Sequence, residues 1–291
     1  MKDSHKIEQY HLHKAHPDKL QFQLHDLKSY RKKNPEKAAI PHSHSYYQLL
    51  WFFNKGGTHT VDFNNYAIEK NMVLFTNKDQ IHSFDANLEV EGWLIHFNES
   101  FFRHSDVDIF LKYNIFNIEQ NPCYLLDDAT AKIAAHHIEL IEKELPNKLS
   151  FGHEDMIRFL LKSLLISVER IHYADTSRKL QINTHYERQF FKFKDLIELH
   201  YTSGLAIIDY ANLLNTSSKT LTTITKNVVD KAPSQLVKER VLLEAKRLLK
   251  FTNLPINEVA FRLGFEDDSY FIKYFKRSIG TSPKAYRNTI S

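Results

Sequence analysis

The chain has 291 residues, 42% of them hydrophobic, which is enough for about two domains with separate cores. The net charge of +4 is unevenly distributed along the chain. Residues 181–291 hold 17 Lys and Arg against 11 Asp and Glu, whereas the remainder holds 22 Lys and Arg against 24 Asp and Glu. The C-terminal part is therefore the part that attracts phosphates. A single cysteine, Cys123, excludes an internal disulfide and a cysteine-based zinc finger. With no run of eighteen apolar residues and no apolar centre within residues 1–20, we expect a soluble cytoplasmic protein.

The first part of the chain favours short strands. A polar beginning contains His5, His11, His13 and His16, which we expect to be solvated. Residues 39–97 then show short extended runs separated by turn residues. The runs cover residues 47–53, 59–63, 72–76 and 92–97. Closely spaced strands of this kind predict a small barrel or sandwich.

Two helices and a linker are predicted next. Asp127 and Asp128 form a candidate cap for a helix that ends at Leu145, before Pro146. A helix over residues 155–172 is apolar around most of its surface. It must therefore pack either against the neighbouring helix or against a second subunit. We expect residues 1–173 to form one domain, 174–189 a linker, and 190–291 a second domain.

The second domain is expected to be entirely helical and to contain a repeat. Predicted helices cover residues 191–200, 206–214, 218–229, 234–251, 256–263 and 268–278. Five residues recur in kind 50 positions later, namely Leu221, Lys226, Val229, Asp230 and Pro233 against Phe271, Lys276, Ile279, Gly280 and Pro283. In the second copy an apolar stripe precedes Gly264, which allows a sharp turn, and Phe265, which fills the corner. These features predict two helix-turn-helix units joined by a long helix.

The second helix of each unit is expected to enter a DNA major groove, because that groove is wide enough to admit a helix. Its outward residues are short and polar, or basic. They are Lys219, Thr222 and Thr223 in the first copy, with Lys226 toward the backbone, and Asp268, Ser269 and Lys273 in the second, with Lys276 and Arg277 toward phosphates. Two alternatives stay open: Asp267 or Asp268 could simply cap the helix, and Lys276 and Arg277 could be solvated charges.

The run INEVAFRLGFEDDSYFIKYFKR at residues 256–277, followed by Gly280, Pro283 and Tyr286, resembles the signature of AraC/XylS-family transcription regulators. The resemblance covers about residues 190–290. It implies a DNA-binding domain of two helix-turn-helix units. The first copy departs from the pattern, because Thr225 stands in place of an aromatic residue and Asp230 in place of a glycine, which bears on the packing of its core.

Of the 17 histidines, 15 precede residue 181. His42, His44, Gln48 and His82 resemble, in spacing, the metal-binding positions of cupin barrels, which are the usual N-terminal partner in many AraC-family regulators. Three imidazoles and an amide oxygen could hold a divalent metal, but we expect no metal or other cofactor, and favour a small effector. The alternative is that these histidines are satisfied in a core or on a rim. The expected effector pocket is lined by His42, His44, Trp51, His82, Trp93 and His96.

We therefore expect an α+β chain of two domains. The first is a small cupin-like β-barrel with helices, and the second is an all-α domain of two helix-turn-helix units joined by a long helix. The expected function is a sequence-specific DNA-binding transcription regulator whose N-terminal barrel senses a small molecule; activation is favoured over repression. Its partners are promoter DNA, a small effector, a second copy of the chain and RNA polymerase. No catalytic motif is found, so no enzyme is expected. The alternatives are a cupin-type metal-dependent enzyme fused to DNA-binding helices, and a regulator without an effector.

Overall fold

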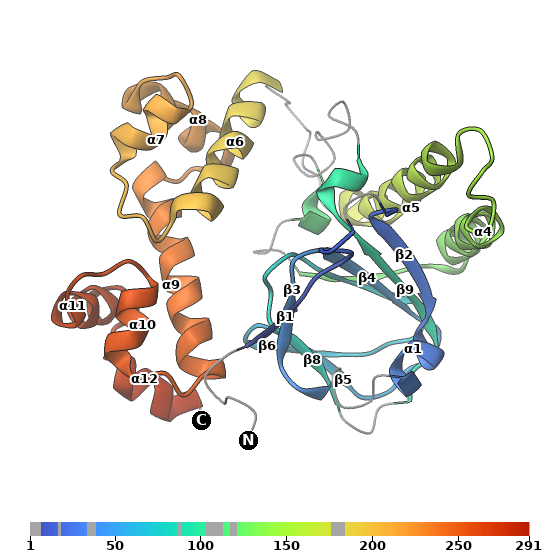
Figure 1. The fold of residues 1–291 in the computed structure, drawn as a ribbon, viewed down its shortest axis with the longest axis horizontal. Coiled ribbons are helices and arrows are strands. Elements are labelled where there is room, and N and C mark those ends of the chain that lie inside the picture. Colours follow the sequence, from blue (N-terminus) through green and yellow to red (C-terminus); the bar gives the residue numbers. More distant parts are fainter. Residues whose placement is uncertain are drawn as a thin grey trace. The chain divides into compact units, whose positions relative to one another are not determined.

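The computed structural model describes residues 7–16, 19–33, 39–85, 89–102, 113–116, 121–175 and 184–290. The chain divides into two compact units, one within residues 8–179 and one within residues 180–291 (Figure 1). The expected linker, residues 174–189, is partly helical. Its first residues belong to a helix that ends at Asp175, and its last residues belong to a helix that starts at Thr184. His5 and residues 176–183 lie outside the described part of the chain.

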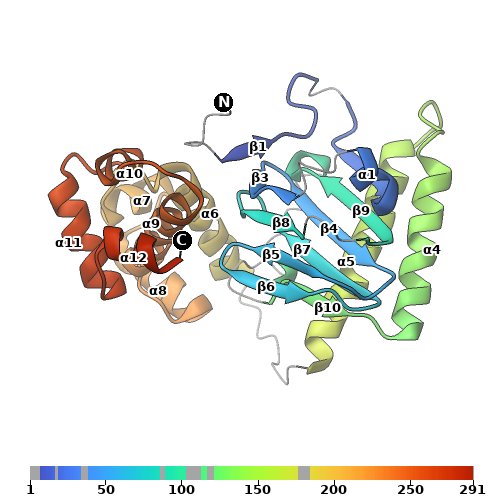
Figure 2. The same cartoon turned by 90° about the horizontal axis from the view of Figure 1, so that it is seen from below.

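The N-terminal unit is built on two five-stranded sheets (Figure 2). The first has the order β1-β3-β8-β5-β6 and the second β10-β7-β4-β9-β2; only the β1–β3 pairing is parallel. The strands are β1 Glu8–Tyr10, β2 Phe22–Asp26, β3 His42–His44, β4 Tyr47–Phe52, β5 Thr58–Val61, β6 Asn64–Ala67, β7 Met72–Thr76, β8 His82–Phe84, β9 Gly92–Phe97 and β10 Cys123–Leu125. Among the described residues the sheets share no strand, so the expected barrel takes the form of two separate sheets.

Strand β4 is buried on both faces, which explains its nearly continuous apolar run. Leu50 and Phe52 join side chains of both sheets in one core, whereas Leu49 and Trp51 belong to a second core on the opposite face. Helices α4 (Asp128–Glu144) and α5 (His153–Asp175) cover that second core. A short helix, α1 (Leu27–Lys33), follows β2, and the single turns η1 (Glu99–Phe101) and η3 (Asn114–Phe116) lie farther along the chain.

The C-terminal unit is entirely helical in its described residues, as expected. Its helices are α6 Thr184–His200, α7 Ile207–Leu213, α8 Ser218–Val229, α9 Pro233–Phe251, α10 Ile256–Arg262, α11 Asp268–Ile279 and α12 Pro283–Ile290. Figure 1 shows α6, α7 and α8 around one end of the long helix α9, and α10, α11 and α12 around its other end. Each end of α9 therefore contributes to a separate core, through Leu236 and Val237 at one and Leu248 and Leu249 at the other.

Two helices of the C-terminal unit, α6 and α12, differ markedly from the sequence expectation. Helix α6 begins at Thr184, inside the expected linker. Its start was not predicted because the first turns are polar and show no apolar periodicity. Helix α12 was not predicted, although Pro283 opens it and the Ser282 hydroxyl accepts a hydrogen bond from the Ala285 backbone N–H at 3.2 Å. No helix in the described ranges combines the length and apolar character needed to cross a membrane.

Candidate DNA-binding surface and effector cavity

The first helix-turn-helix unit consists of α7 and α8. Its turn passes through Asn215, whose φ of 51° is left-handed, and the Thr216 N–H donates to the Ala211 carbonyl at 2.9 Å. Ser217 then caps α8 by accepting from the Thr220 N–H at 3.1 Å. Leu221 and Ile224 are buried, as expected from their spacing. The four residues predicted to face DNA are all exposed, namely Lys219, Thr222, Thr223 and Lys226.

The two threonines of α8 have their hydroxyl protons committed within the helix. Thr222 Oγ1 donates to the Ser218 carbonyl at 2.9 Å, and Thr223 Oγ1 donates to the Lys219 carbonyl at 3.1 Å. Each side chain therefore presents a methyl group and oxygen lone pairs outward. Such a surface suits contact with a thymine methyl or acceptance of a base amino group, and not donation to a base.

The second unit consists of α10 and α11, and it makes a tight turn at Gly264. The φ of Gly264 is 82°, and a Cβ at this position would lie 1.8 Å from the Thr202 carbonyl oxygen, so no larger residue fits without a shift. Phe265 follows and packs with its ring centroid 5.3 Å from that of Phe271 and 5.2 Å from that of Tyr274. The expected role of Phe265 as a plug between the two helices is confirmed.

The start of α11 settles which aspartate caps the helix. Asp267 accepts from the N–H groups of Ser269 and Tyr270 at 2.9 and 3.2 Å, so it is the cap. Asp268 occupies the first turn and is exposed. Phe271 and Phe275 are fully buried, and the remaining residues predicted to face DNA are exposed, namely Ser269, Lys273, Lys276 and Arg277.

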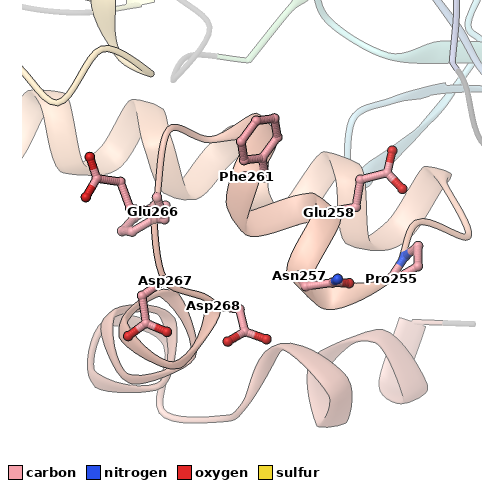
Figure 3. Close-up of a pocket in the computed structure, with 8 residues that line it drawn as sticks. Pro255, Asn257, Glu258, Phe261, Glu266, Asp267 and Asp268 are labelled. Carbon is pink, nitrogen blue, oxygen red and sulfur yellow. The ribbon is translucent and has the colours of Figure 1, made fainter.

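A hollow of about 530 Å³ lies between α10 and the start of α11 (Figure 3). Its lining includes the carboxylates of Glu258, Glu266, Asp267 and Asp268, together with Phe261, whose side chain is 78% exposed. Four carboxylates repel phosphate groups. This hollow is therefore unsuited to contact with a phosphate backbone.

The N-terminal unit contains a cavity of about 270 Å³ lined by both of its sheets. The lining residues are Tyr10, His11, Leu12, His13, Gln23, Leu27, Tyr30, Arg31, His42, His44, Tyr46, Gln48, Leu50, His82, Phe84, Leu94 and His96. Four of the six predicted effector residues are among them, since His42, His44, His82 and His96 all line the cavity. The structure also brings in residues that the sequence had not singled out, above all Tyr10, Tyr30 and Arg31.

Two of the predicted effector residues do not reach this cavity. Trp51 belongs to the core under α4 and α5, and Trp93 packs against the same core. Both alternate with cavity residues on their own strands, Trp51 with Leu50 and Trp93 with Leu94, so they point to the opposite face of the sheet. The expected lining is corrected accordingly. His11 and His13, expected to be solvated, line the cavity instead.

The cavity histidines are connected by short contacts. His42 Nδ1 donates to the Ile40 carbonyl at 2.8 Å, and His44 Nδ1 lies 3.2 Å from His82 Nε2. His82 Nδ1 lies 3.2 Å from His59 Nε2. On the facing sheet, His96 and Gln48 are directly opposite across β9 and β4, and His96 Nε2 donates to Gln48 Oε1 at 3.0 Å.

Burial controls the protonation of these rings. Loss of hydration lowers the pKa of His42, His44, His82 and His96 below the usual value, and the neighbouring imidazoles lower those of the last three further. The fully buried His59 has its pKa lowered to about 3 for the same reasons. The cluster is therefore neutral at neutral pH, and its ring nitrogens can act as lone-pair donors.

Comparison with known proteins supports the C-terminal assignment. A family described as a helix-turn-helix domain matches residues 210–289. The raffinose operon transcriptional regulatory protein RafR of Pediococcus pentosaceus is 29% identical over 169 residues, covering 58% of this chain and 59% of RafR. The transcriptional regulator YisR of Bacillus subtilis is 26% identical, covering 53% of each protein. The matched part of this chain thus spans less than two thirds of the length of either relative.

The HTH-type transcriptional activator RhaS of Yersinia pestis is 21% identical over 256 residues, covering 88% of this chain and 92% of RhaS. Among solved structures, the C-terminal domain of the response regulator yesN from Fusobacterium nucleatum is 32% identical, with a TM-score of 0.31, covering 33% of this chain and 93% of that one. With the two observed units, the matched helix-turn-helix region and the likeness to these curated transcription regulators identify the C-terminal part of the chain as a helix-turn-helix DNA-binding domain similar to those of the AraC/XylS family.

Proposed function

We propose that the chain is a sequence-specific transcription regulator that binds double-stranded promoter DNA in the cytoplasm through both helix-turn-helix units. The observation that carries the proposal is the exposure of short polar and basic side chains on α8 and α11, on two units that share the helix α9. Two recognition helices held by one spacer can enter successive major grooves on one face of DNA. The connection to the N-terminal unit lies within residues 174–189.

Within this proposal the two recognition helices contact bases with different chemistry. On α8, Lys219 precedes Thr222 and Thr223, whose outward methyl groups and lone pairs suit thymine or a base amino group. On α11, Lys273 suits the O6 and N7 acceptors of guanine, and Asp268 with Ser269 suits the amino group of cytosine. The phosphate contacts fall to Lys226, Lys276 and Arg277 near the ends of the helices.

The test is selection of bound sites from random DNA duplexes by the full chain at physiological salt, which suppresses non-specific binding. We expect two short conserved blocks about one helical turn apart. Lys273→Ala should relax base choice in one block. Lys276→Ala should weaken binding to all DNA sequences alike. It should also reduce the salt dependence of the affinity by the amount expected for about one phosphate contact.

Lys132→Ala is the matched control, because it removes the same charge from an exposed site on α4 of the other unit. A chain that enriches no sequence would refute the proposal. Unchanged sequence preference in Lys273→Ala would show that α11 is placed wrongly on the DNA.

The N-terminal cavity is proposed as the effector site. A volume of about 270 Å³ and a lining of imidazole, phenol and amide groups suit a small polar molecule. The effector acts by binding one arrangement of the regulator better than another. Screening small metabolites for a shift in the melting temperature of the full chain tests this point. A regulator without an effector would show no shift, and turnover of a bound molecule would favour the metal-dependent enzyme.

A second copy of the chain is proposed to bind at the α4–α5 end of the N-terminal unit. Large apolar side chains are exposed there, with Leu149 102%, Phe151 108%, Met156 52% and Phe159 60% exposed. Contiguous exposed apolar groups on a folded protein favour association. Sedimentation of the full chain should show a dimer that Phe151→Ser with Phe159→Ser converts to a monomer. As an activator, the DNA-bound dimer would contact RNA polymerase.

A further inference from the structure

The two helix-turn-helix units are joined at a second place besides the shared helix α9. After α6 ends at His200, Tyr201 packs against the cores of both units. The next residue, Thr202, lies against the turn of the second unit, where its carbonyl oxygen would be only 1.8 Å from a Cβ on Gly264. Residues 201–202 therefore connect the first unit to the second, and we call them the α6 bridge.

Arg240 holds the α6 bridge against α9. The C-terminal end of α6 lies beside α9 (Figure 1), and there the Arg240 Nε donates to both carboxylate oxygens of Glu198, at 2.7 and 2.9 Å. The Arg240 Nη1 donates to Glu244 of α9 at 3.0 Å. The guanidinium carbon lies 4.1 Å from the centroid of the Tyr201 ring. A planar guanidinium makes these contacts at the same time, which the single ammonium group of a lysine cannot do.

The shared helix α9 does not by itself fix the two units relative to each other. Long helices bend gently, and helices packed on them slide by small shear movements. A contact away from the axis of α9 opposes both movements. We infer that the α6 bridge and Arg240 fix the orientation of α8 relative to α11, and so set the spacing between the two DNA blocks that the chain accepts. This inference rests on the proposed function, in which both helices read DNA.

The accepted spacing depends on this orientation because DNA is itself a helix. One added base pair moves the second block by about 3.4 Å along the DNA axis and turns it by about 35°. A rigid pair of recognition helices follows such a shift only if the DNA is bent or twisted, which costs free energy. A loosely joined pair follows it by moving the units. Arg240 and Tyr201 are thus positioning residues that act on specificity through α8 and α11.

The first test measures the affinity of the full chain for operators in which the spacing between the two selected blocks is changed. In the unaltered chain a change of two base pairs should lower affinity by about 100-fold or more, because the contacts of one block are lost. In Arg240→Met this spacing penalty should fall below about 10-fold. Binding to DNA that carries only one block should stay unchanged, because each unit keeps its own core. Glu198→Gln, at a half-exposed carboxylate, should reduce the penalty less.

Arg262→Met is the matched control. Arg262 also pairs with a glutamate four positions away in sequence, Glu258, but both residues lie within α10 and make no connection between the units through this pair. Its spacing penalty should equal that of the unaltered chain. Loss of one-block binding in Arg240→Met would overturn the inference, because it would confine the role of Arg240 to the stability of one unit. An unchanged spacing penalty in Arg240→Met would also overturn it.

The second test needs no DNA. In a Cys123→Ser background, spin labels at Asn212→Cys and Asn257→Cys, two exposed positions on α7 and α10, report the distance between the units by electron spin resonance. We expect one narrow distance distribution that Arg240→Met broadens and Arg262→Met does not. A distribution that stays narrow in Arg240→Met would overturn the inference. A chain that enriches no DNA sequence but shows the broadening would refute the proposed function and still support the rigid connection.

Discussion

The two helix-turn-helix units of the C-terminal domain begin their turns with the same backbone geometry but with different residues. In both, the second residue after the first helix is left-handed, Asn215 in one and Gly264 in the other, and the N–H of the next residue donates to an alanine carbonyl. The first turn is shorter by one residue, because Ser217 caps α8 two positions after Asn215, whereas Asp267 caps α11 three positions after Gly264. The backbone geometry is thus conserved between the units while the residue identities are not.

The cores of the units differ in the origin of their aromatic ring. In the second unit Phe275 of α11 is buried beside the small Val259 of α10 in the same core. In the first unit the corresponding recognition helix carries Thr225, fully buried, and the ring comes from Tyr210 of α7, also fully buried. A buried aromatic ring is therefore supplied by α11 in the second unit and by α7 in the first, which explains how Thr225 is accommodated where the resembling family has an aromatic residue.

The largest expected effect tests this exchange of aromatic residues. Tyr210→Ala should destabilise the C-terminal unit by roughly 3–5 kcal/mol, because it removes the largest ring from the first core, which also holds Phe193 at a centroid distance of 5.5 Å. Val259→Ala, the matched change in the second unit, should cost only about 2 kcal/mol. Urea unfolding followed by circular dichroism measures both. Equal losses would mean that α8, and not α7, holds the first core together.

The next effect concerns the two turns. Gly264→Ala should cost roughly 2–4 kcal/mol, because the new Cβ meets the Thr202 carbonyl oxygen at 1.8 Å and the φ of 82° disfavours any L side chain. Asn215→Ala replaces a residue that already carries a Cβ at a φ of 51°, so it should cost about 1 kcal/mol. The same unfolding measurement applies. A Gly264→Ala loss no larger than that of Asn215→Ala would show that α10 can shift away from Thr202 freely.

The C-terminal unit could be predicted from sequence more fully than the N-terminal one, for physical reasons. Long amphipathic helices leave periodic signals, and α8 was predicted to the residue, whereas the eight-residue α12 was missed. Strands β1, β3 and β8 have three residues each, too few to show alternation. Their pairing brings Tyr10 beside His44, a contact across 34 positions of sequence that no local pattern encodes.

The cavity shows both the reach and the limit of sequence patterns. His42, His44 and His82 could be found because their spacing resembles that of cupin positions, and His96 because it lies on the longer, alternating strand β9. The placement of Trp51 and Trp93 was wrong although alternation alone could have corrected it, since each is one residue from an apolar cavity side chain. Tyr30 and Arg31 come from the short helix α1, which was not predicted from the sequence although Asp26 accepts a hydrogen bond from the Ser29 N–H at its start, and only the tertiary fold brings them to the cavity.

The smallest effect on stability is expected where the recognition helices end. Asp230 and Gly280 are both left-handed and both donate their N–H to the carbonyl of a lysine, Lys226 or Lys276. Asp230 also holds Lys226, whose Nζ lies 3.2 Å from the Asp230 carbonyl oxygen and 3.4 Å from its carboxylate. In the first unit, the lysine that we propose to contact phosphate is thus held by Asp230 and has a carboxylate beside it, whereas Gly280 of the second unit has no side chain to do so.

Asp230→Gly should therefore change stability by less than about 1 kcal/mol, because relief of the left-handed strain is offset by the greater freedom of glycine in the unfolded chain. Its effect on DNA should be larger: affinity at low salt should rise, and the salt dependence should steepen by up to about 0.9, the value for one added phosphate contact. Fluorescence anisotropy over a salt series measures the slope. Because the gain requires a released Lys226, it should vanish in the double variant with Lys226→Ala. A gain that persists there would show that removal of the carboxylate alone, by reducing repulsion of the phosphates, distinguishes the ends of the two recognition helices.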